Sequence, residues 1–130
     1  MASKKSYDNL QEKVRGLKTP AIETWANKYA DKDYEVRIET SEFTCICPKT
    51  GLPDFALIRI EYVPDKRCAE LKSFKTYLTY FRDIGIFHEH VINTIFDDFL
   101  RYCKPRRAKI TGEFNLRGGI KTTVTREFFS

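Results

Sequence analysis

A thiol and a carboxyl, Cys47 and Asp54, lie seven residues apart in the sequence. Two prolines and a glycine between them predict a tight turn, which would leave both side chains at the ends of strands. A thiolate becomes a nucleophile when neighbouring hydrogen-bond donors or cations favour it. Two acidic groups in contact titrate as a coupled pair, so one holds a proton while the other is charged. The pair therefore predicts a nucleophile and a general acid in one site.

Each of these residues also has an ordinary structural interpretation. A cysteine is commonly a small buried hydrophobe, and an aspartate after a proline commonly caps a turn. Cys45 lies two residues before Cys47, and the spacing alone does not decide which thiol would react. Lys49 is a cation close in sequence that could favour a thiolate. The pattern of residue types leaves both interpretations open.

A second group of side chains could recognise a substrate and a cofactor. His88 and Glu89 begin a predicted helix, where a carboxylate either complements the helix N-terminus or accepts paired hydrogen bonds from a guanine-like ring edge. Glu70 offers a second carboxylate of the same kind. Lys72 and Lys75 lie three residues apart on one side of a predicted helix, where they form either a solvated stripe or a phosphate site. No Gly-x-Gly-x-x-Gly pattern occurs, so a nicotinamide cofactor would bind without a Rossmann fold.

The alternation of hydrophobic and polar residues predicts the elements that carry these side chains. A period of two indicates strands, and hydrophobic residues at helical spacing indicate helices. The expected elements in chain order are strands at 34–40 and 55–63, helices at 69–82 and 88–103, and strands at 108–114 and 120–128. The order ββααββ predicts an α+β fold, with an antiparallel four-stranded sheet backed by two helices. The first two strands would form a hairpin whose loop holds Cys47.

The composition is that of one compact domain. The chain has 130 residues, of which 42% are hydrophobic, enough for a substantial core. We expect a single domain over residues 19–130 and a flexible leader over residues 1–18, which lack hydrophobic periodicity. No hydrophobic run approaches the length of a membrane span, and the N-terminus does not resemble a signal peptide. We therefore expect a cytoplasmic protein without a membrane partner.

Charge and cysteine spacing argue against nucleic-acid binding and against metal binding. The net charge is +5, but basic residues are interspersed with nearly as many acidic ones, and only residues 104–109 form a dense basic cluster. We expect no stable nucleic-acid partner. The four cysteines are expected to be free thiols. Neither Cys-x-x-Cys nor His-x-x-x-His occurs, so no metal site is predicted.

Four parts of the sequence together resemble one family of enzymes. They are Cys47-Pro48-Lys49-Thr50-Gly51 with Pro53-Asp54-Phe55, the helix Glu70-Leu71-Lys72-Ser73-Phe74-Lys75, Phe87-His88-Glu89, and Arg117-Gly118-Gly119. In this order and spacing, from about Glu42 to Gly119, the chain resembles the QueF family of nitrile oxidoreductases. These are the NADPH-dependent 7-cyano-7-deazaguanine reductases of queuosine biosynthesis, and the resemblance is to the single-domain type.

The resemblance implies a role for several residues. Cys47, rather than Cys45, would be the nucleophile that forms a covalent thioimide with the nitrile, and Asp54 would be the proton donor. Five further residues would contact the substrate: Ala69, Glu70, Leu71, His88 and Glu89. The product would be the amine 7-aminomethyl-7-deazaguanine.

The resemblance also implies a cofactor, a fold and an assembly. Lys72 and Lys75 would belong to the NADPH motif, with two NADPH used per turnover. Thr76 departs from this motif, which more often has leucine or another large residue there. The implied architecture is the tunnelling fold, whose subunits join sheet edges into barrels. Family members form homo-oligomers, commonly decamers of two pentamers, so the active sites would lie between subunits.

Three other functions fit parts of the pattern. A QueF-like amidinotransferase would attack the same nitrile with ammonia on transfer RNA, but those relatives lack the NADPH motif. A purine- or RNA-binding module without catalysis could use residues 104–109, but it would leave Cys47 and Asp54 without a task. A pterin or GTP cyclohydrolase shares the tunnelling fold but in the familiar case needs zinc, for which the chain has no convincing ligand set. The reductase is therefore the function that we expect.

Overall fold

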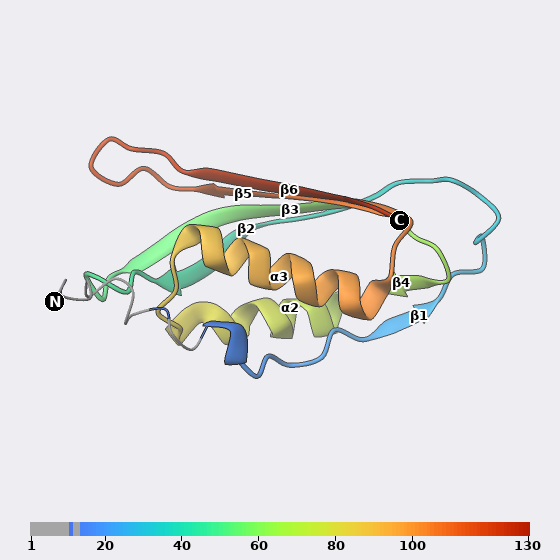
Figure 1. Ribbon diagram of the computed structural model, residues 1–130, viewed down its shortest axis with the longest axis horizontal. Coiled ribbons are helices and arrows are strands. Elements are labelled where there is room, and N and C mark those ends of the chain that lie inside the picture. The colour runs from blue at the N-terminus through green and yellow to red at the C-terminus, as the bar shows by residue number, and fades with distance from the viewer. Residues whose placement is uncertain (1–10, 12–13) are drawn as a thin grey trace, which may run out of the picture.

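The computed structural model of the chain describes residue 11 and residues 14–130 (Figure 1). Residues 1–10 and 12–13 of the expected leader lie outside the described residues. The described part of the leader includes a short 3-10 helix, η1 (Val14–Gly16). Val14 and Leu17 pack against the hydrophobic core. This part of the expected leader therefore belongs to the packed domain.

A four-stranded sheet and two helices make up most of the domain. After η1 the elements are β1 (Thr24–Ala26), β2 (Val36–Ile46), β3 (Pro53–Val63), β4 (Arg67–Ala69), α2 (Leu71–Thr79), the 3-10 helix η2 (Tyr80–Asp83), α3 (His88–Cys103), β5 (Arg107–Phe114) and β6 (Thr123–Phe129). The major sheet has the strand order β2-β3-β5-β6, and each neighbouring pair is antiparallel. Figure 1 shows α2 and α3 on one side of this sheet. The predicted α+β fold with the order ββααββ is confirmed.

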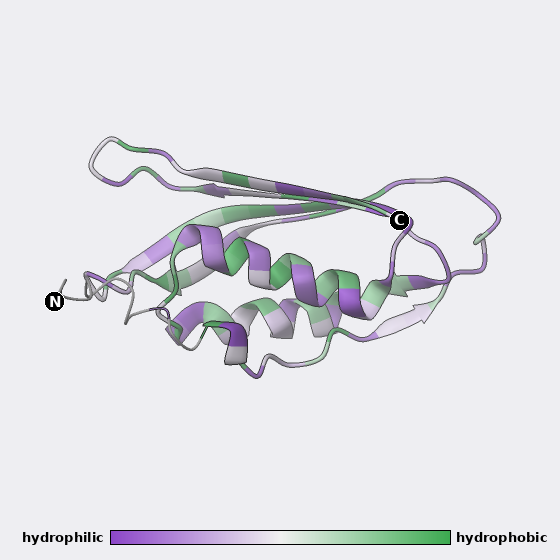
Figure 2. Ribbon diagram, viewed as in Figure 1, coloured by the Kyte–Doolittle hydropathy of each residue, from purple (hydrophilic) through white to green (hydrophobic). Residues whose placement is uncertain are grey.

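The core lies between the sheet and the two helices. Alternate residues of β3 are buried on the helix side, as its sequence predicts: Ala56, Ile58, Ile60 and Tyr62. Hydrophobic and hydrophilic residues alternate along α3 in Figure 2, as expected of an amphipathic helix. A Cβ atom on Gly112 of β5 would lie 2.3 Å from Cδ1 of Ile92 in α3. Glycine at this position therefore allows α3 to pack closely on the sheet.

β2 is longer than the predicted strand 34–40, because a bulge interrupts its alternation. The pairing of β2 with β3 shifts register between Thr40 and Phe43. Such a bulge adds a residue to one strand and reverses which side chains face the core. Phe43 and Cys45, after the bulge, are fully buried. The alternation of hydrophobic and polar residues therefore predicts only the first part of β2, up to Thr40, and not the part that leads to Cys47.

α3 follows the prediction, and α2 differs from it at both ends. α3 has the predicted bounds, 88–103. The predicted helix 69–82 begins instead at Leu71, because Glu70 is its N-cap residue. It ends at Thr79 and continues as η2.

The remaining strands differ from the prediction in two places. The last strand was expected at 120–128 but begins at Thr123. Ile120 belongs to the preceding turn, where its backbone N–H and C=O pair with those of Arg117. A two-stranded sheet of β1 and β4 was not predicted, because strands of three residues are too short for alternation to identify them.

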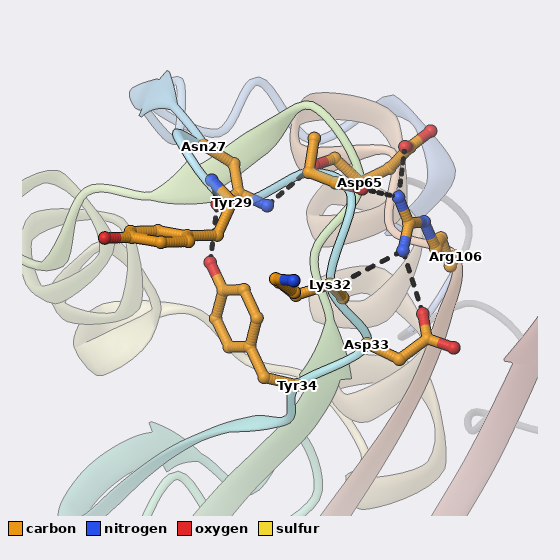
Figure 3. A network of polar contacts seen from close by, with 8 residues as sticks. Asn27, Tyr29, Lys32, Asp33, Tyr34, Asp65 and Arg106 are labelled. Carbon is orange, nitrogen blue, oxygen red and sulfur yellow. Dashed lines mark hydrogen bonds and ion pairs between the residues drawn. The ribbon is translucent and has the colours of Figure 1, made fainter.

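Arg106 fixes the loop between β1 and β2. Its guanidinium pairs with Asp33 and Asp65 at 2.8 and 3.4 Å (Figure 3). The Tyr34 hydroxyl donates a hydrogen bond of 2.6 Å to Oδ1 of Asn27. These contacts hold the beginning of β2, at the end opposite to Cys47.

Candidate active site

Cys47 lies immediately after β2 in a closed turn. Its backbone N–H donates to the carbonyl of Leu52, and its carbonyl accepts from the N–H of Gly51, both at 2.8 Å. Gly51 has φ of 72°, a conformation that glycine adopts without the steric cost of a side chain. Cys47 is half-buried, whereas Cys45 is fully buried. The turn therefore holds the Cys47 sulfur at the edge of the core.

Asp54 lies on the neighbouring strand close to this sulfur. It pairs directly with Cys45 across β2 and β3, and Cys47 follows Cys45 by two residues, the period at which side chains return to one face of a strand. The Asp54 side chain is only 7% exposed. Its negative charge acts on the Cys47 thiol. The structure brings together the thiol and the carboxyl that the sequence analysis singled out.

The turn after Cys47 favours the thiolate. Partial burial opposes the charged form, but hydrogen bonds from the Thr50 side chain and from the backbone N–H groups of Thr50 and Lys49 outweigh it and lower the pKa of Cys47. The carboxylate of Asp54 opposes this effect in part. Burial raises the pKa of Cys45 to about 12. Cys47 is therefore the thiol of the two that ionises more readily.

His88 reaches Asp54 from the first turn of α3. A β-bridge between Ile46 and Gly85 brings the segment before α3 to the end of β2. Nε2 of His88 lies 3.1 Å from Oδ2 of Asp54. The imidazole stacks on Phe114, with ring centroids 3.7 Å apart and planes at 5°. The imidazole is thus held between Phe114 of the sheet and the Asp54 carboxyl, and His88 is also the first residue of α3.

Arg117 contacts the other oxygen of Asp54. One of its Nη atoms, Nη2, lies 3.0 Å from Oδ1 of Asp54 and also donates to the carbonyl of Pro53. Arg117 belongs to the turn between β5 and β6, in which Gly118 and Gly119 have φ of 57° and 79°. These three residues were expected to form a turn and are part of the family resemblance, but no role was predicted for Arg117 itself. Its contact with a residue 63 positions earlier follows from the pairing of β3 with β5.

Glu89 is exposed beside this cluster. It follows His88 in the first turn of α3, where its charge complements the helix N-terminus. Within the part of the chain that the structure describes, its carboxylate forms no ion pair. It can therefore accept hydrogen bonds from a bound molecule.

The other three expected substrate residues lie apart from this cluster. Ala69 is buried, and Glu70 and Leu71 are at the N-terminal end of α2. The Glu70 carboxylate accepts from the backbone N–H groups of Ser73 and Lys72 at 2.7 and 2.8 Å, and these bonds lower its pKa. The axis of α2, nine residues or about 13 Å long, then separates Glu70 from the segment after α2 that lies beside Cys47. One subunit therefore does not bring all seven expected catalytic and substrate residues together.

A groove of about 510 Å³ runs between β2 and α2. Residues 38–44 form one wall, and the other includes Leu71, Phe74, Lys75 and Arg82. Lys75 lines the groove and Lys72 does not. Neither Lys75 nor Arg82 forms an ion pair with another described residue. Arg82 was missed by sequence reasoning, because it lies beyond α2 in a 3-10 turn where helical spacing no longer applies.

The described residues give no sign of a metal site or a membrane span. Among them, no three His, Cys, Asp or Glu side chains are grouped so that they could hold a metal ion. All four cysteines are free, and Cys68 and Cys103 are buried. No described helix is long and apolar enough to cross a membrane.

Comparison with protein families and curated proteins gives consistent matches. The model of a family described as QueF-like protein matches residues 53–129. A protein of Nitrosococcus oceani is 56% identical over 107 residues, which are 82% of this chain and 83% of that protein. A protein of Elusimicrobium minutum is 50% identical over 116 residues, 89% of this chain and 87% of that protein. Both carry the name NADPH-dependent 7-cyano-7-deazaguanine reductase.

A solved structure has the same fold. It is described as a crystal structure of the archaeosine synthase QueF-Like in the apo form. The TM-score is 0.69 at 22% sequence identity, over 74% of this chain and 94% of that chain. The tunnelling fold expected from the sequence is therefore confirmed.

Proposed function

Since the chain belongs to the QueF family, we propose that it is an NADPH-dependent 7-cyano-7-deazaguanine reductase. It reduces the nitrile 7-cyano-7-deazaguanine to the amine 7-aminomethyl-7-deazaguanine in queuosine biosynthesis. One observation carries this proposal beyond the similarity: the thiol of Cys47 has a lowered pKa and lies beside the buried carboxyl of Asp54. The four free cysteines agree with a cytoplasmic enzyme.

Cys47 acts as the nucleophile. A nitrile carbon is electrophilic, and the thiolate adds to it to form a carbon–sulfur bond while one π bond between carbon and nitrogen breaks. The product of this step is a covalent thioimide on Cys47. The three hydrogen bonds from Thr50 and Lys49 supply the thiolate that the step requires.

Asp54 provides the proton for the nitrile nitrogen. As the π bond breaks, its electron pair goes to nitrogen, which needs a proton at that moment. Asp54 lies near the sulfur and is shielded from water, with both oxygens fixed by neighbouring side chains. A fixed and partly buried acid is well placed for transfer to an atom bonded to the carbon under attack.

Glu89 and His88 recognise the substrate. The carboxylate of Glu89 can accept two parallel hydrogen bonds from the N–H groups of a guanine-like edge. A site built for two such bonds discriminates strongly against molecules that lack them, because the carboxylate would then be left without donors. The substrate ring would thus lie between Glu89 and Cys47, against the imidazole of His88.

The groove between β2 and α2 fits a phosphate-bearing cofactor. Lys75 and Arg82 supply two cations for the phosphates, and neither forms an ion pair within the described part of the chain; Leu71 and Phe74 supply an apolar surface. Lys72 lies outside the groove lining and would reach a phosphate from its rim. When bound, NADPH supplies the hydride, and reduction of a nitrile to an amine takes two hydrides.

The separation of the expected substrate residues favours a site shared between two copies of the chain. Ala69, Glu70 and Leu71 contact the same small molecule as Cys47 only if they come from a neighbouring subunit. The sheet permits such an assembly, since β2 and β6 are its edges and run in opposite directions. β6 of one copy can therefore pair antiparallel with β2 of the next, and repetition closes a ring. We place the enzyme in a homo-oligomer, a decamer of two pentamers.

Mixed oligomers test the shared site. Cys47→Ala and Glu70→Gln variants should each be inactive alone. After the two are unfolded together and refolded, some sites would combine an intact Cys47 with an intact Glu70, so activity should return. A mixture that stays inactive, although both variants assemble normally, would contradict the shared site.

The function itself is tested by the stoichiometry of the reaction. Purified protein is mixed with 7-cyano-7-deazaguanine and NADPH, the loss of NADPH absorbance is followed, and the product is identified by mass spectrometry. We expect two NADPH to be consumed per amine formed, and none with Cys47→Ala. A covalent adduct on Cys47 without NADPH oxidation would favour the amidinotransferase instead, and neither adduct nor oxidation would leave a binding protein.

A further inference from the structure

Two different side chains hold the two oxygens of Asp54. Arg117 contacts Oδ1 at 3.0 Å, and His88 contacts Oδ2 at 3.1 Å. The Asp54 side chain is 7% exposed, so little water reaches either oxygen. Four ionisable side chains face Asp54. They are Cys45 from β2, Cys47 from the turn after β2, His88 from α3 and Arg117 from the turn between β5 and β6.

Arg117 and His88 differ in whether the Asp54 oxygen that each contacts can carry a proton. A guanidinium has N–H donors only and keeps its charge, so Oδ1 cannot carry a proton directed at Arg117. An imidazole nitrogen donates or accepts, depending on its tautomer, so Oδ2 can carry a proton directed at His88. The structure thus makes the two oxygens of Asp54 chemically unequal.

The turn that carries Arg117 is built to keep it in this position. Arg117 and Ile120 exchange two backbone hydrogen bonds of 3.0 and 2.9 Å, which close the turn. The N–H of Asn115 donates to the carbonyl of Phe55 at 2.9 Å, which ties the base of the turn to β3 next to Asp54. The same Nη2 atom that contacts Asp54 also donates to the carbonyl of Pro53. Arg117 is therefore anchored to the backbone as well as to the carboxyl.

We infer that Arg117 is a positioning residue that confines the transferred proton to Oδ2 of Asp54. Oδ1 stays in its ion pair with the guanidinium throughout, and the proton leaves from Oδ2 to the nitrile nitrogen. The step balances: the carbon–sulfur bond forms, one carbon–nitrogen π bond breaks, nitrogen gains the proton, and Asp54 becomes a carboxylate whose charge the Arg117 guanidinium stabilises. This inference rests on the proposed function, since it names the path of the proton in that reaction.

Two substitutions of Arg117 test whether a charged donor is needed at this position. Arg117→Met keeps the length of the side chain but has no donor, whereas Arg117→Lys keeps a charged donor. Lys121→Met is the matched control, because Lys121 belongs to the same turn region but pairs with Glu113 at 3.1 Å and does not contact Asp54.

The readout is the rate at which 7-cyano-7-deazaguanine forms an adduct on Cys47 without NADPH, measured by intact mass over a range of pH. We expect Arg117→Met to slow adduct formation by about tenfold or more, the size of effect expected when a close charged partner of a buried carboxyl is lost. Arg117→Lys should recover most of the rate, and Lys121→Met should retain it. An adduct rate and pH profile in Arg117→Met equal to those of the wild type would overturn the inference.

Alkylation of Cys47 by iodoacetamide separates the proton path from an effect on the sulfur. Alkylation needs a thiolate but no proton donor, so at a pH where the thiolate is fully formed Arg117→Met should react at the wild-type rate. Its adduct formation at neutral pH, divided by the thiolate fraction that the alkylation profile gives, should remain slower than that of the wild type. If alkylation and adduct formation fall equally, Arg117 acts on the sulfur or on the fold, and the inference is wrong.

The same substitution in a second background shows whether Arg117 acts through Asp54. In Asp54→Asn the proton to be confined is absent, so adding Arg117→Met should slow adduct formation by less than about twofold, within the uncertainty of additivity. A further loss of tenfold there would contradict a role through Asp54. No adduct with the wild-type protein would overturn the proposed function and this inference with it, whereas a wild-type adduct unaffected by Arg117→Met would overturn the inference alone.

Discussion

The reactivity of Cys47 should depend on the hydroxyl of Thr50. Removing this donor by Thr50→Val leaves the thiolate with only its two backbone hydrogen bonds, from Thr50 and Lys49. Thr50→Val also removes the hydrogen bond of 3.2 Å that the Leu52 N–H donates to this hydroxyl, but the two backbone bonds of Cys47 to Gly51 and Leu52 remain and should hold the turn. We therefore expect the pKa of Cys47 to rise in Thr50→Val.

The size of the effect follows from the strength of the lost bond. A hydrogen bond to a charged group contributes about 1.5–3 kcal/mol. One pKa unit corresponds to about 1.36 kcal/mol, so the bond is equivalent to about one to two units. Cys47 is half-buried, and water can replace part of the lost bond, so the lower end applies. Below the pKa the thiolate fraction, and with it the rate of alkylation, should fall about tenfold.

The assay is the pH dependence of alkylation by iodoacetamide, with the modified residue located by peptide mass spectrometry. The native protein should be modified once, because Cys45, Cys68 and Cys103 are buried. Burial also raises the pKa of Cys45 and Cys103 to about 12. Thr50→Ser keeps the hydroxyl and should behave like the wild type. A Thr50→Val profile that matches the wild type, or modification of Cys45 before Cys47, would refute this account of the thiol.

Three further outcomes are expected. Gly112→Ala should destabilise the fold by about 1–3 kcal/mol in denaturant unfolding, because its Cβ would overlap Ile92. Gly16 has open space around it, so Gly16→Ala should change stability by less than about 0.5 kcal/mol. Equal effects of the two substitutions would contradict the close packing of α3. Glu89→Leu should weaken binding of 7-cyano-7-deazaguanine far more than binding of NADPH in calorimetry, and equal weakening would argue against a role in substrate recognition. Lys75→Gln should weaken NADPH binding more than Lys72→Gln does, since only Lys75 lines the groove, and the reverse order would move the cofactor out of it.

Elements with an uninterrupted period could be predicted from the sequence. β3 alternates between buried and exposed positions for most of its length, and α3 keeps helical spacing from its first residue to its last. The second half of β2 could not be predicted in this way, since the bulge after Thr40 changes which residues face the core. The spacing of hydrophobic residues predicts an element correctly where one face of that element is buried along its whole length. It fails where a bulge changes which side chains face the core.

The sequence predicted contacts of the site between residues close in the chain, but not contacts between residues far apart in it. Cys47 and Asp54 lie across a short turn, so their closeness follows from the hairpin alone. Arg117 reaches Asp54 only because β5 pairs with β3 and the chain then turns back over its end. Glu70 was grouped with Glu89 as a carboxylate of the same kind, but α2 separates the two in one subunit, and helix capping occupies Glu70. Distances of this sort depend on the packing of whole elements rather than on spacing in the chain.

Locating the bond that the nitrile forms tests the role of Cys47 most directly. The protein is incubated with 7-cyano-7-deazaguanine without NADPH, digested under conditions that preserve the adduct, and mapped by tandem mass spectrometry. We expect one added mass equal to that of the intact nitrile, on Cys47, and no such mass when NADPH is added before digestion. An adduct on Cys45, or a Cys47→Ala variant that still forms one, would contradict it.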